Sequence, residues 1–242
     1  MVLLLDVGNT IIKAALLTEG LIQEVFNLGL NDHQSIDELL RKYPKLRLCF
    51  MSAVRELPEP ISKSLSEKMI VRMLSSEMSM PFTLAYETSE TLGTDRIAAV
   101  AAAWEMYPAE NVLVIDMGSC ITYDFLSADG VYYGGAISPG IEMRFKAMHT
   151  FTARLPLVSA VGAANLIGET TIASLQSGVM NGVQAELDGI IEQYEARYQP
   201  LKILVGGGDN KYFDKKFKIN IFATSNLVLE GLRVILNYNR FG

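Results

Sequence analysis

The sequence predicts an α/β protein made of two similar halves that pack against each other. The main observation is an internal repeat: residues 3–22 align with residues 113–132 at a constant offset of 110, without a gap. Strand-like and helix-like patterns alternate through the rest of the chain, as in layered α/β folds. Half of the 242 residues are hydrophobic and 20% are charged, which suits a folded protein with a sizeable core.

Each copy of the repeat predicts a β-meander. An apolar strand leads into a tight turn with a glycine, which is Gly8 in the first copy and Gly118 in the second. A second strand follows, then an acidic residue with glycine, then a third strand. Two matching turns at one offset favour duplication over coincidence. We expect the boundary near residues 107–111, which gives halves of 1–109 and 110–242.

The remaining elements follow from apolar spacing and turn residues. In the first half we expect helices at 34–43 and 58–69, a strand at 46–51, and an alanine-rich helix at 95–106. In the second half we expect a helix at 140–149 and a long helix at 170–198, which three glycines break or ease. A strand at 202–205 and a helix at 227–237 complete the chain, with no linker or low-complexity segment.

Charge and cysteine content exclude several classes of function. With 21 basic and 27 acidic residues the net charge is −6, which disfavours generic binding to nucleic acid or an anionic membrane. The first residues do not resemble a signal peptide, and the apolar stretch 97–104 is too short to span a bilayer. Cys49 and Cys120 lie in strand-like apolar runs, which favours buried reduced thiols and a cytoplasmic location.

The turn after the first strand is the first candidate binding site. It reads DVGNT at residues 6–10, with Lys13 on the next strand. Gly8 permits a turn whose backbone N–H groups converge, which suits a phosphate chain, and Asp6 could hold a metal-bound water beside it. The same residues also make a good hairpin turn without a ligand. Neither a P-loop nor a G-x-G-x-x-G fingerprint occurs in the chain.

The second repeat brings an equivalent turn, DMGS at residues 116–119, to the other half. Two phosphate-type turns that face one cleft between duplicated halves are the arrangement expected for a nucleotide bound between domains. The repeat therefore weakens the interpretation of the first turn as a plain hairpin.

Residues 93–96, Gly-Thr-Asp-Arg, head the alanine-rich helix. Thr94 or Asp95 is a suitable N-cap, and a cap needs no further function. Arg96 is unusual, because a cation in the first turn opposes the helix dipole, whereas an arginine beside backbone N–H groups binds carboxylates or phosphates well. Asp95 in such a site could accept the proton of an attacking hydroxyl, as a kinase requires. We therefore favour a functional interpretation over capping alone.

Two glycine-rich corners are further candidates. GGAISPG at residues 134–140 lies where a strand ends and a helix begins; its glycines allow close approach of a ligand or of another backbone. GGGD at residues 206–209 is either a nucleotide-edge loop or a simple turn. The two histidines have no metal-ligand spacing, and no G-x-S-x-G nucleophile elbow occurs.

DVGNT, GTDR, DMGS and GGAISPG resemble, in order and spacing, the motifs of the type III pantothenate kinase family. The resemblance covers nearly the whole chain, since GETT at 168–171, Ser177-Gly178 and LEGL at 229–232 also match. It implies a duplicated actin/hexokinase-like (ribonuclease H-like) ATPase fold with a cleft between two halves. It also implies ATP-dependent phosphorylation of the 4′-hydroxyl of pantothenate, the first step of coenzyme A biosynthesis, by a homodimer that uses Mg²⁺ and a monovalent cation, K⁺ or NH₄⁺.

The resemblance implies a role for each matching residue. Asp95 would be the catalytic base, Asp116 would ligate the monovalent cation, and Asp6 would hold Mg²⁺ through water. The implied ATP and phosphate contacts are Asp6, Val7, Gly8, Asn9, Thr10, Ile11, Ile12, Lys13 and Ser119. The implied substrate contacts are Tyr86, Gly93, Thr94, Asp95, Arg96 and Thr171, with Arg96 on the carboxylate of pantothenate.

The chain departs from the family pattern at residues 119–120 and after the glycine loop. Ser119 stands where the family usually has threonine, and it keeps the hydroxyl, whereas Cys120 stands where the family often has alanine or threonine. Asp209-Asn210 follow the glycine loop where a small residue is expected, so the adenine contacts stay open. The alternatives are a kinase of this fold for another small hydroxy acid, a nucleotide-binding regulatory protein, and an actin-like filament protein. A panel of acceptor substrates would distinguish a pantothenate kinase from a kinase for another hydroxy acid, because the fold does not choose the acceptor. ATP binding without turnover would indicate the regulatory protein.

Overall fold

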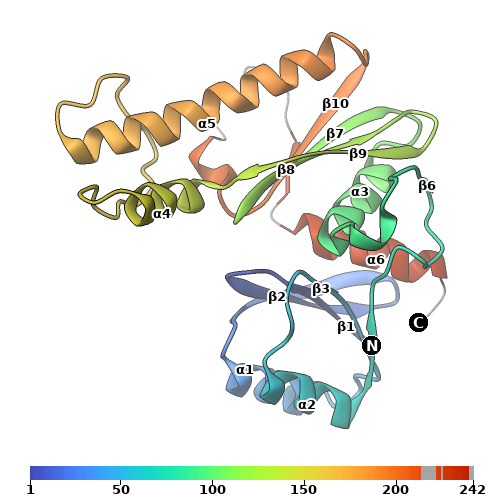
Figure 1. Ribbon diagram of the computed structural model, residues 1–242. Coiled ribbons are helices and arrows are strands. Elements are labelled where there is room, and N and C mark those ends of the chain that lie inside the picture. The colour runs from blue at the N-terminus through green and yellow to red at the C-terminus, as the bar shows by residue number, and fades with distance from the viewer. Residues whose placement is uncertain (214–221, 225, 240–242) are drawn as a thin grey trace. The chain divides into compact units, whose positions relative to one another are not determined.

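The computed structural model describes residues 1–213, 222–224 and 226–239 (Figure 1). The chain forms two compact units. Unit 1 comprises Met1–Pro108, Gly130–Tyr133 and Asn226–Gly242, and unit 2 comprises Ala109–Asp129 and Gly134–Ser225. This division begins close to residue 109, as the repeat suggests. It differs from a simple split into 1–109 and 110–242, because the last helix of the chain groups with unit 1.

Unit 1 contains a five-stranded sheet in the order β3-β2-β1-β4-β5. The antiparallel meander consists of β1 (Val2–Val7), β2 (Ile11–Thr18) and β3 (Leu21–Gly29). Strands β4 (Leu48–Ala53) and β5 (Ile70–Met73) extend the sheet in parallel on the other side of β1. The central strands β1 and β4 are apolar and buried over most of their length, because helices cover both faces of the sheet.

Helices α1 (His33–Lys42) and α2 (Glu59–Lys68) cover one face of this sheet and close a core around Leu3, Leu5 and Ile12 (Figure 1). Helices α3 (Thr94–Met106) and α6 (Leu227–Asn239) pack together and contact β4 and β1. A Cβ atom on Gly231 of α6 would lie only 1.6 Å from the carbonyl oxygen of Ala98. The alanines of α3 and this glycine therefore allow a close helix pair, which ties the end of the chain to unit 1.

The sheet of unit 2 repeats the meander. It has the order β11-β10-β7-β8-β9-β6, with β7 (Asn111–Met117), β8 (Cys120–Leu126) and β9 (Val131–Pro139) as the repeated strands. Strands β10 (Leu201–Gly206) and β11 (Phe222–Ala223) continue it in parallel next to β7. The short β6 (Thr83–Leu84) pairs with the first residues of β9, which are those that group with unit 1.

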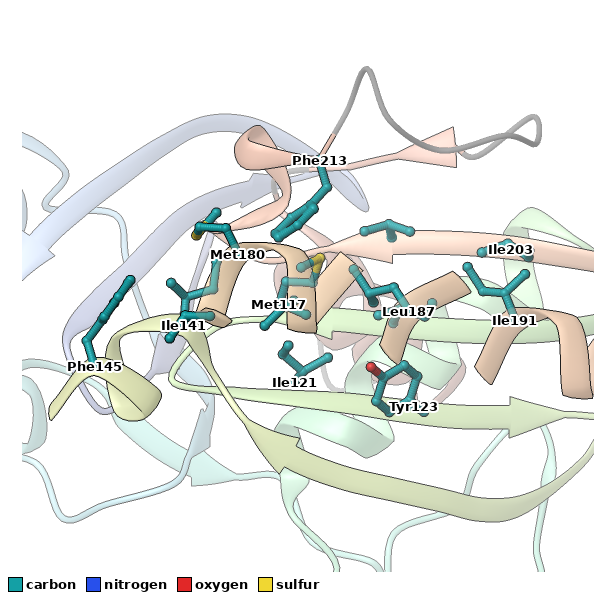
Figure 2. Packing of buried hydrophobic residues seen from close by; sticks show 14 of the residues in the cluster. Met117, Ile121, Tyr123, Ile141, Phe145, Met180, Leu187, Ile191, Ile203 and Phe213 are labelled. Atoms are coloured by element: carbon teal, nitrogen blue, oxygen red, sulfur yellow. The ribbon is translucent and has the colours of Figure 1, made fainter. Parts of the chain in front are cut away.

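Helix α5 (Thr171–Glu195) lies along one face of the β7–β10 sheet, and α4 (Ile141–Phe151) follows the end of β9 and contacts α5 (Figure 1). Figure 2 shows the core between α5 and the sheet, where Met180 and Leu187 of α5 lie in one cluster with Ile121 and Tyr123 of β8. The three glycines of α5 do not break this helix, contrary to one sequence expectation. Its buried apolar side chains, one or two per turn, outweigh the weak helix preference of glycine.

The expected helices and the longer strands all occur, with ends shifted by a few residues. Strands β5, β6 and β11 were not predicted; β6 and β11 have two residues each, and β5 lies exposed at a sheet edge. Single-turn 3₁₀ helices occur at Ser89–Thr91 and Asn210–Tyr212. In the part of the chain that the structure describes, none of the helices has the length and apolarity required to cross a membrane.

The two meanders differ by one residue in their first turn. In unit 1 Val7 pairs with Ile12, so that residues 8–11 form the turn. In unit 2 Met117 pairs with Ile121, so that residues 118–120 form it. The alignment without a gap is therefore wrong along the second strand of the repeat.

The offset of 110 is restored in the third strand, because the second turn is longer in unit 2 than in unit 1 and makes up for the shorter first turn. Residues 19–20 separate β2 from β3, whereas residues 127–130 separate β8 from β9. In space the equivalent of Lys13 is therefore Thr122, which lies opposite Asp116 as Lys13 lies opposite Asp6. Sequence alignment of the repeat pairs Lys13 with Tyr123 instead.

Candidate active site

In unit 1 the predicted phosphate turn lies beside a group of polar residues at the ends of β1, β2 and β4. Asp6 is the register partner of Lys13 on β2 and of Ser52 on β4. Directly paired residues on neighbouring strands point to the same face, so the three side chains lie on one face of the sheet. A contact described below places the N-terminus of α3 on that face.

The turn itself exposes polar side chains between two buried apolar ones. Asn9 and Thr10 are exposed at the tip, whereas Val7 and Ile12 are fully buried in the core. A phosphate at this turn would therefore meet the backbone of Val7 and Ile12 but not their side chains. The N–H of Gly8 donates a 3.1 Å hydrogen bond to the carbonyl of residue 11, which closes the turn.

Helix α3 starts differently from the cap expected on the sequence. Its N-cap is Gly93, and no side chain caps the helix. The Oγ1 atom of Thr94 lies 2.9 Å from Oγ of Ser52 and accepts a 3.3 Å hydrogen bond from the N–H of Ala53. The expectation that Thr94 or Asp95 is the N-cap is therefore wrong, because both residues lie inside the helix and the Thr94 hydroxyl points at β4.

Asp95 and Arg96 follow in the first turn of α3. The Oδ1 atom of Asp95 accepts a 2.9 Å hydrogen bond from the N–H of Arg96, and this half-buried carboxylate lies where the helix dipole stabilises negative charge. The side chain of Arg96 is 6% exposed, and its guanidinium carbon lies 5.8 Å from the centre of the Tyr86 ring. Unit 1 thus brings Tyr86, Asp95 and Arg96 to one helix end. A guanidinium with five N–H donors can bind a carboxylate there.

In unit 2 Asp116 occupies the position equivalent to Asp6. It is the register partner of Thr122 on β8 and of Gly206 on β10. Ser119 lies in the three-residue turn that follows and is partly exposed. The structure therefore places Asp116 and Ser119 at the same end of the unit 2 sheet, as the repeat predicts.

The GGAISPG segment packs closely against this turn. A Cβ atom on Gly135 would lie 1.6 Å from the carbonyl oxygen of Tyr123, and one on Gly140 would lie 2.3 Å from that of Gly118. The N–H of Gly140 donates a 3.1 Å hydrogen bond to the carbonyl of Ser119. These glycines are required by backbone contacts, so the segment is a structural corner that supports the second turn.

The GGGD loop also folds onto the end of β7. Gly207 has a φ of +89°, and a Cβ atom there would lie 2.2 Å from the carbonyl oxygen of Met117. The N–H of Asp209 donates a 3.0 Å hydrogen bond to the same oxygen. Burial raises the pKa of the Asp209 carboxyl above its ordinary value. Packing thus accounts for Gly207 in this loop, and an adenine contact stays a prediction.

Thr171, the last expected substrate contact, is the exposed first residue of α5 in unit 2. The cap of that helix is Thr170, whose side chain accepts a 3.1 Å hydrogen bond from the N–H of Ala173. The Thr171 side chain is therefore not used in capping.

An ionic network in unit 2 was not predicted from the sequence. The guanidinium of Arg144 on α4 contacts the carboxylate of Glu186 on α5 and lies 3.0 Å from Oγ of Ser138. Its Nε donates a 2.8 Å hydrogen bond to the carbonyl of Pro139, and the hydroxyl of Tyr123 donates one of 2.9 Å to Glu186. The network fixes the GGAISPG corner. The sequence holds no local signal for it, since Arg144 and Glu186 are 42 residues apart.

Ser52 is a second residue that sequence reasoning missed. It is a serine at the end of an apolar strand, and polar residues at the ends of neighbouring parallel strands gather at one edge of a sheet. That signal could have found it.

The two cysteines are free thiols; burial raises the pKa of Cys49 to about 12, whereas Cys120 is partly exposed and so less buried than expected.

The residues of the first turn fit a magnesium ion bound together with ATP. Magnesium usually keeps several waters and takes one or two protein carboxylates plus phosphate oxygens. Within residues 1–213, 222–224 and 226–239, no group of three or more histidine, cysteine, aspartate or glutamate side chains forms a metal cage. The single carboxylate of Asp6 beside the turn suits a hydrated ion.

Solved structures share this fold. A Campylobacter jejuni structure, described as a conserved candidate Baf family transcriptional activator, has a TM-score of 0.61 with 23% identity over 98% of both chains. A candidate 2-dehydro-3-deoxygalactonokinase from Sinorhizobium meliloti has a TM-score of 0.58 with 11% identity, over 99% of this chain and 98% of that one. Together with the repeated meanders, these likenesses define the class: an α/β protein with the duplicated actin/hexokinase-like fold.

The sequence comparisons identify the family within this class. The type III pantothenate kinase family model matches residues 2–193. A type III pantothenate kinase of Christiangramia forsetii is 43% identical over 239 residues, and one of Phocaeicola vulgatus is 42% identical over 238; each alignment covers 98% of both chains. The chain therefore belongs to the type III pantothenate kinase family, and it is an enzyme that phosphorylates pantothenate with ATP.

Proposed function

We propose that, in phosphoryl transfer from ATP to the 4′-hydroxyl of pantothenate, the first turn of α3 supplies the groups that act on pantothenate, and each of the two repeated turns supplies contacts to ATP or its cations. The product, 4′-phosphopantothenate, is formed in the first step of coenzyme A biosynthesis. The observation that carries this assignment of residues is the end of α3, where the Asp95 carboxylate accepts a hydrogen bond from the N–H of Arg96 and the buried Arg96 guanidinium lies beside the Tyr86 ring.

Asp95 is the proposed catalytic base. The oxygen of the 4′-hydroxyl attacks the γ-phosphorus of ATP while the bond to the bridging β,γ-oxygen breaks and ADP leaves. The hydroxyl proton passes to the Asp95 carboxylate. Because such transition states demand little covalent work from the protein, most of the rate comes from holding the two substrates in line and from stabilising charge.

Arg96 is the proposed partner of the pantothenate carboxylate. A guanidinium presents parallel N–H donors that match the two carboxylate oxygens, and burial strengthens this interaction because water competes less. Tyr86 packs near the guanidinium and keeps it in place. Gly93 and Thr171 are proposed as further contacts on the family resemblance alone.

The ATP phosphates are proposed to bind the turn at residues 6–13 and Ser119. Gly8 gives access to backbone N–H groups, Lys13 adds a positive charge opposite Asp6, and Ser119 offers a hydroxyl in the second turn. Magnesium bound with ATP near Asp6 would neutralise phosphate charge. Asp116 is the proposed ligand of a monovalent cation, K⁺ or NH₄⁺.

We also propose that the enzyme is a cytoplasmic homodimer. Unit 2 exposes the apolar side chains of Phe151, Leu166 and Ile167, which are 78–85% accessible. Exposed apolar side chains of this kind are typical of protein interfaces. The two free thiols support a reducing compartment. Light scattering of the purified protein would give its mass in solution, and a monomer at micromolar concentration would contradict the dimer.

The decisive experiment measures ADP release with magnesium-ATP and pantothenate in potassium buffer and again in sodium buffer. We expect turnover that requires pantothenate and is faster in potassium. Equal rates in both buffers would contradict the proposed cation site at Asp116. ATP binding without turnover in either buffer would contradict the proposed catalytic arrangement.

A further inference from the structure

Ser52 is a wholly buried hydroxyl at the end of β4, in the apolar strand sequence LCFMSA. Burying a hydroxyl is unfavourable unless it forms a hydrogen bond. The Ser52 hydroxyl meets this need 2.9 Å from Oγ1 of Thr94. Serine in this strand therefore joins β4 to the first residue of α3.

The bond lies between the phosphate turn and the proposed base. On the strand side, Ser52 is the register partner of Asp6, and the N–H of Val54 donates a 3.1 Å hydrogen bond to the carbonyl of Val7. On the helix side, Thr94 immediately precedes Asp95 in the chain. A short path of contacts thus runs from Asp6 through Ser52 and Thr94 to Asp95.

The Thr94 hydroxyl is committed to the strand. It lies near Oγ of Ser52 and accepts a hydrogen bond from the N–H of Ala53. Because Gly93 is the N-cap and provides no side chain, these bonds hold the start of α3 in place where a cap would ordinarily do so. The hydroxyl of Thr94 therefore makes a structural contact with β4, and its contact with pantothenate stays a prediction.

We propose that Ser52 and Thr94 are positioning residues, which hold the first turn of α3 against β4 and thereby fix Asp95 relative to the phosphate turn at Asp6. The proposal rests on the proposed role of Asp95 as base. Loss of the bond should leave both substrates able to bind but should misplace the base. Displacement of a reacting group by about 1 Å can lower a rate by about 10²-fold.

The test compares Ser52→Ala, Thr94→Val and the double variant by steady-state kinetics with pantothenate and magnesium-ATP. We expect each single change to lower kcat at least about 10-fold, with KM for ATP changed less than about 2-fold. The double variant should be no slower than the slower single variant, because both changes break one bond. Thr94→Ser keeps the hydroxyl and should retain most of the rate.

Cys49→Ala is the matched control. Cys49 is fully buried on the same strand, but it belongs to the core between the sheet and the helices α1 and α2, so its loss destabilises β4 without touching α3. If Ser52→Ala lowers kcat no more than Cys49→Ala does, the positioning proposal is wrong. It is also wrong if the double variant shows the product of the two single effects. Thr94 lies at the partly exposed start of α3, so Thr94→Val should fold even if Ser52→Ala does not. Its kcat then tests the proposal alone.

Asp95→Asn and the unaltered protein belong to the same series. If the unaltered protein shows no turnover, or if Asp95→Asn keeps its rate, the proposed role of Asp95 fails and the positioning proposal fails with it. If both behave as expected while Ser52→Ala and Thr94→Val keep their kcat, only the positioning proposal fails.

Discussion

The two repeated turns have the same carboxylate but different neighbours. In unit 1 Asp6 lies between Lys13 on one adjacent strand and Ser52 on the other. In unit 2 the equivalent neighbours of Asp116 are Thr122 and Gly206. Duplication thus kept the acidic residue at the strand end and changed what lies on either side of it.

We propose that this change gives the two turns different roles. Lysine beside the first carboxylate adds positive charge where a phosphate would bind, whereas threonine beside the second adds none. A carboxylate whose paired neighbour is neutral suits direct contact with a metal cation, as we propose for Asp116, whereas Asp6 beside Lys13 is proposed to hold magnesium only through water and together with phosphate. Conserved scaffold geometry therefore does not imply conserved chemistry at equivalent positions.

In each unit the start of one helix is held near the first turn, but in different ways. In unit 1 side-chain hydroxyls hold the start of α3 against β4. In unit 2 the backbone of Gly140 packs directly on the turn, and Gly135 packs on β8. Substitutions near the first site should therefore alter turnover, whereas those at the glycines of the second should alter folding.

The largest expected effect is at Gly135. In Gly135→Ala the new methyl group would lie 1.6 Å from the carbonyl oxygen of Tyr123, which belongs to the backbone of a central strand. We expect a loss of more than about 3 kcal/mol in the free energy of unfolding, or no folded protein. Gly182→Ala is the control: apart from the adjoining helix backbone, no atom would lie within 4 Å of the added Cβ, and alanine should stabilise α5 by up to about 1 kcal/mol. Chemical denaturation measures both; equal stabilities would contradict the close contact.

Asp95→Asn should have the next largest effect, on rate alone. Asparagine keeps an oxygen that can accept the hydrogen bond from Arg96, so the fold should persist. Loss of the base should lower kcat by about 10² or more. The melting temperature and kcat, measured on one preparation, check both parts. Unchanged turnover would remove Asp95 from the mechanism.

Arg96→Ala should mainly raise KM for pantothenate. If the guanidinium holds the carboxylate in the ground state and the transition state alike, KM should rise about 10-fold or more with a smaller change in kcat. Arg96→Lys keeps the charge but loses the paired donors, and it should restore binding only in part. A pantothenate analogue in which a hydroxyl group replaces the carboxylate should be phosphorylated equally well by the unaltered protein and by Arg96→Ala. If Arg96→Ala still has the higher KM with this analogue, the proposed carboxylate contact is wrong.

The smallest effect concerns the network that supports the GGAISPG corner. Burial raises the pKa of Glu186, but hydrogen bonds from Arg144, Ser138 and Tyr123 outweigh it and hold this pKa below the ordinary 4.5. A lowered carboxyl pKa stabilises the fold above about pH 4.5, and this contribution disappears as the pH falls through the folded-state pKa. Glu186→Gln should therefore lower the free energy of unfolding by about 1 kcal/mol at pH 7 and by less below pH 4. Chemical denaturation at each pH measures this difference. A difference that does not change with pH would show that it does not come from the lowered pKa of Glu186.

The sequence anticipated most elements and the motif residues near the ends of strands. The repeat located both turns, and GTDR located the helix end that carries Asp95 and Arg96. It did not anticipate Ser52, since the available signal, a serine near the end of an apolar strand, becomes distinctive only once the neighbouring strands are known. The expected cap at Thr94 was wrong for the same reason, because its competing partner lies 42 residues away.

The sequence by itself determined the α/β alternation, the duplication, the glycine turns and the order of the four motifs, because periodicity and turn chemistry act over a few neighbouring residues. Only the tertiary structure decided the shorter second turn, the grouping of α6 with unit 1, the bond between Ser52 and Thr94, and the network of Arg144 and Glu186. These features depend on strand register and on close packing between distant segments. Such contacts are selected by the energy of the whole fold and not by local preference.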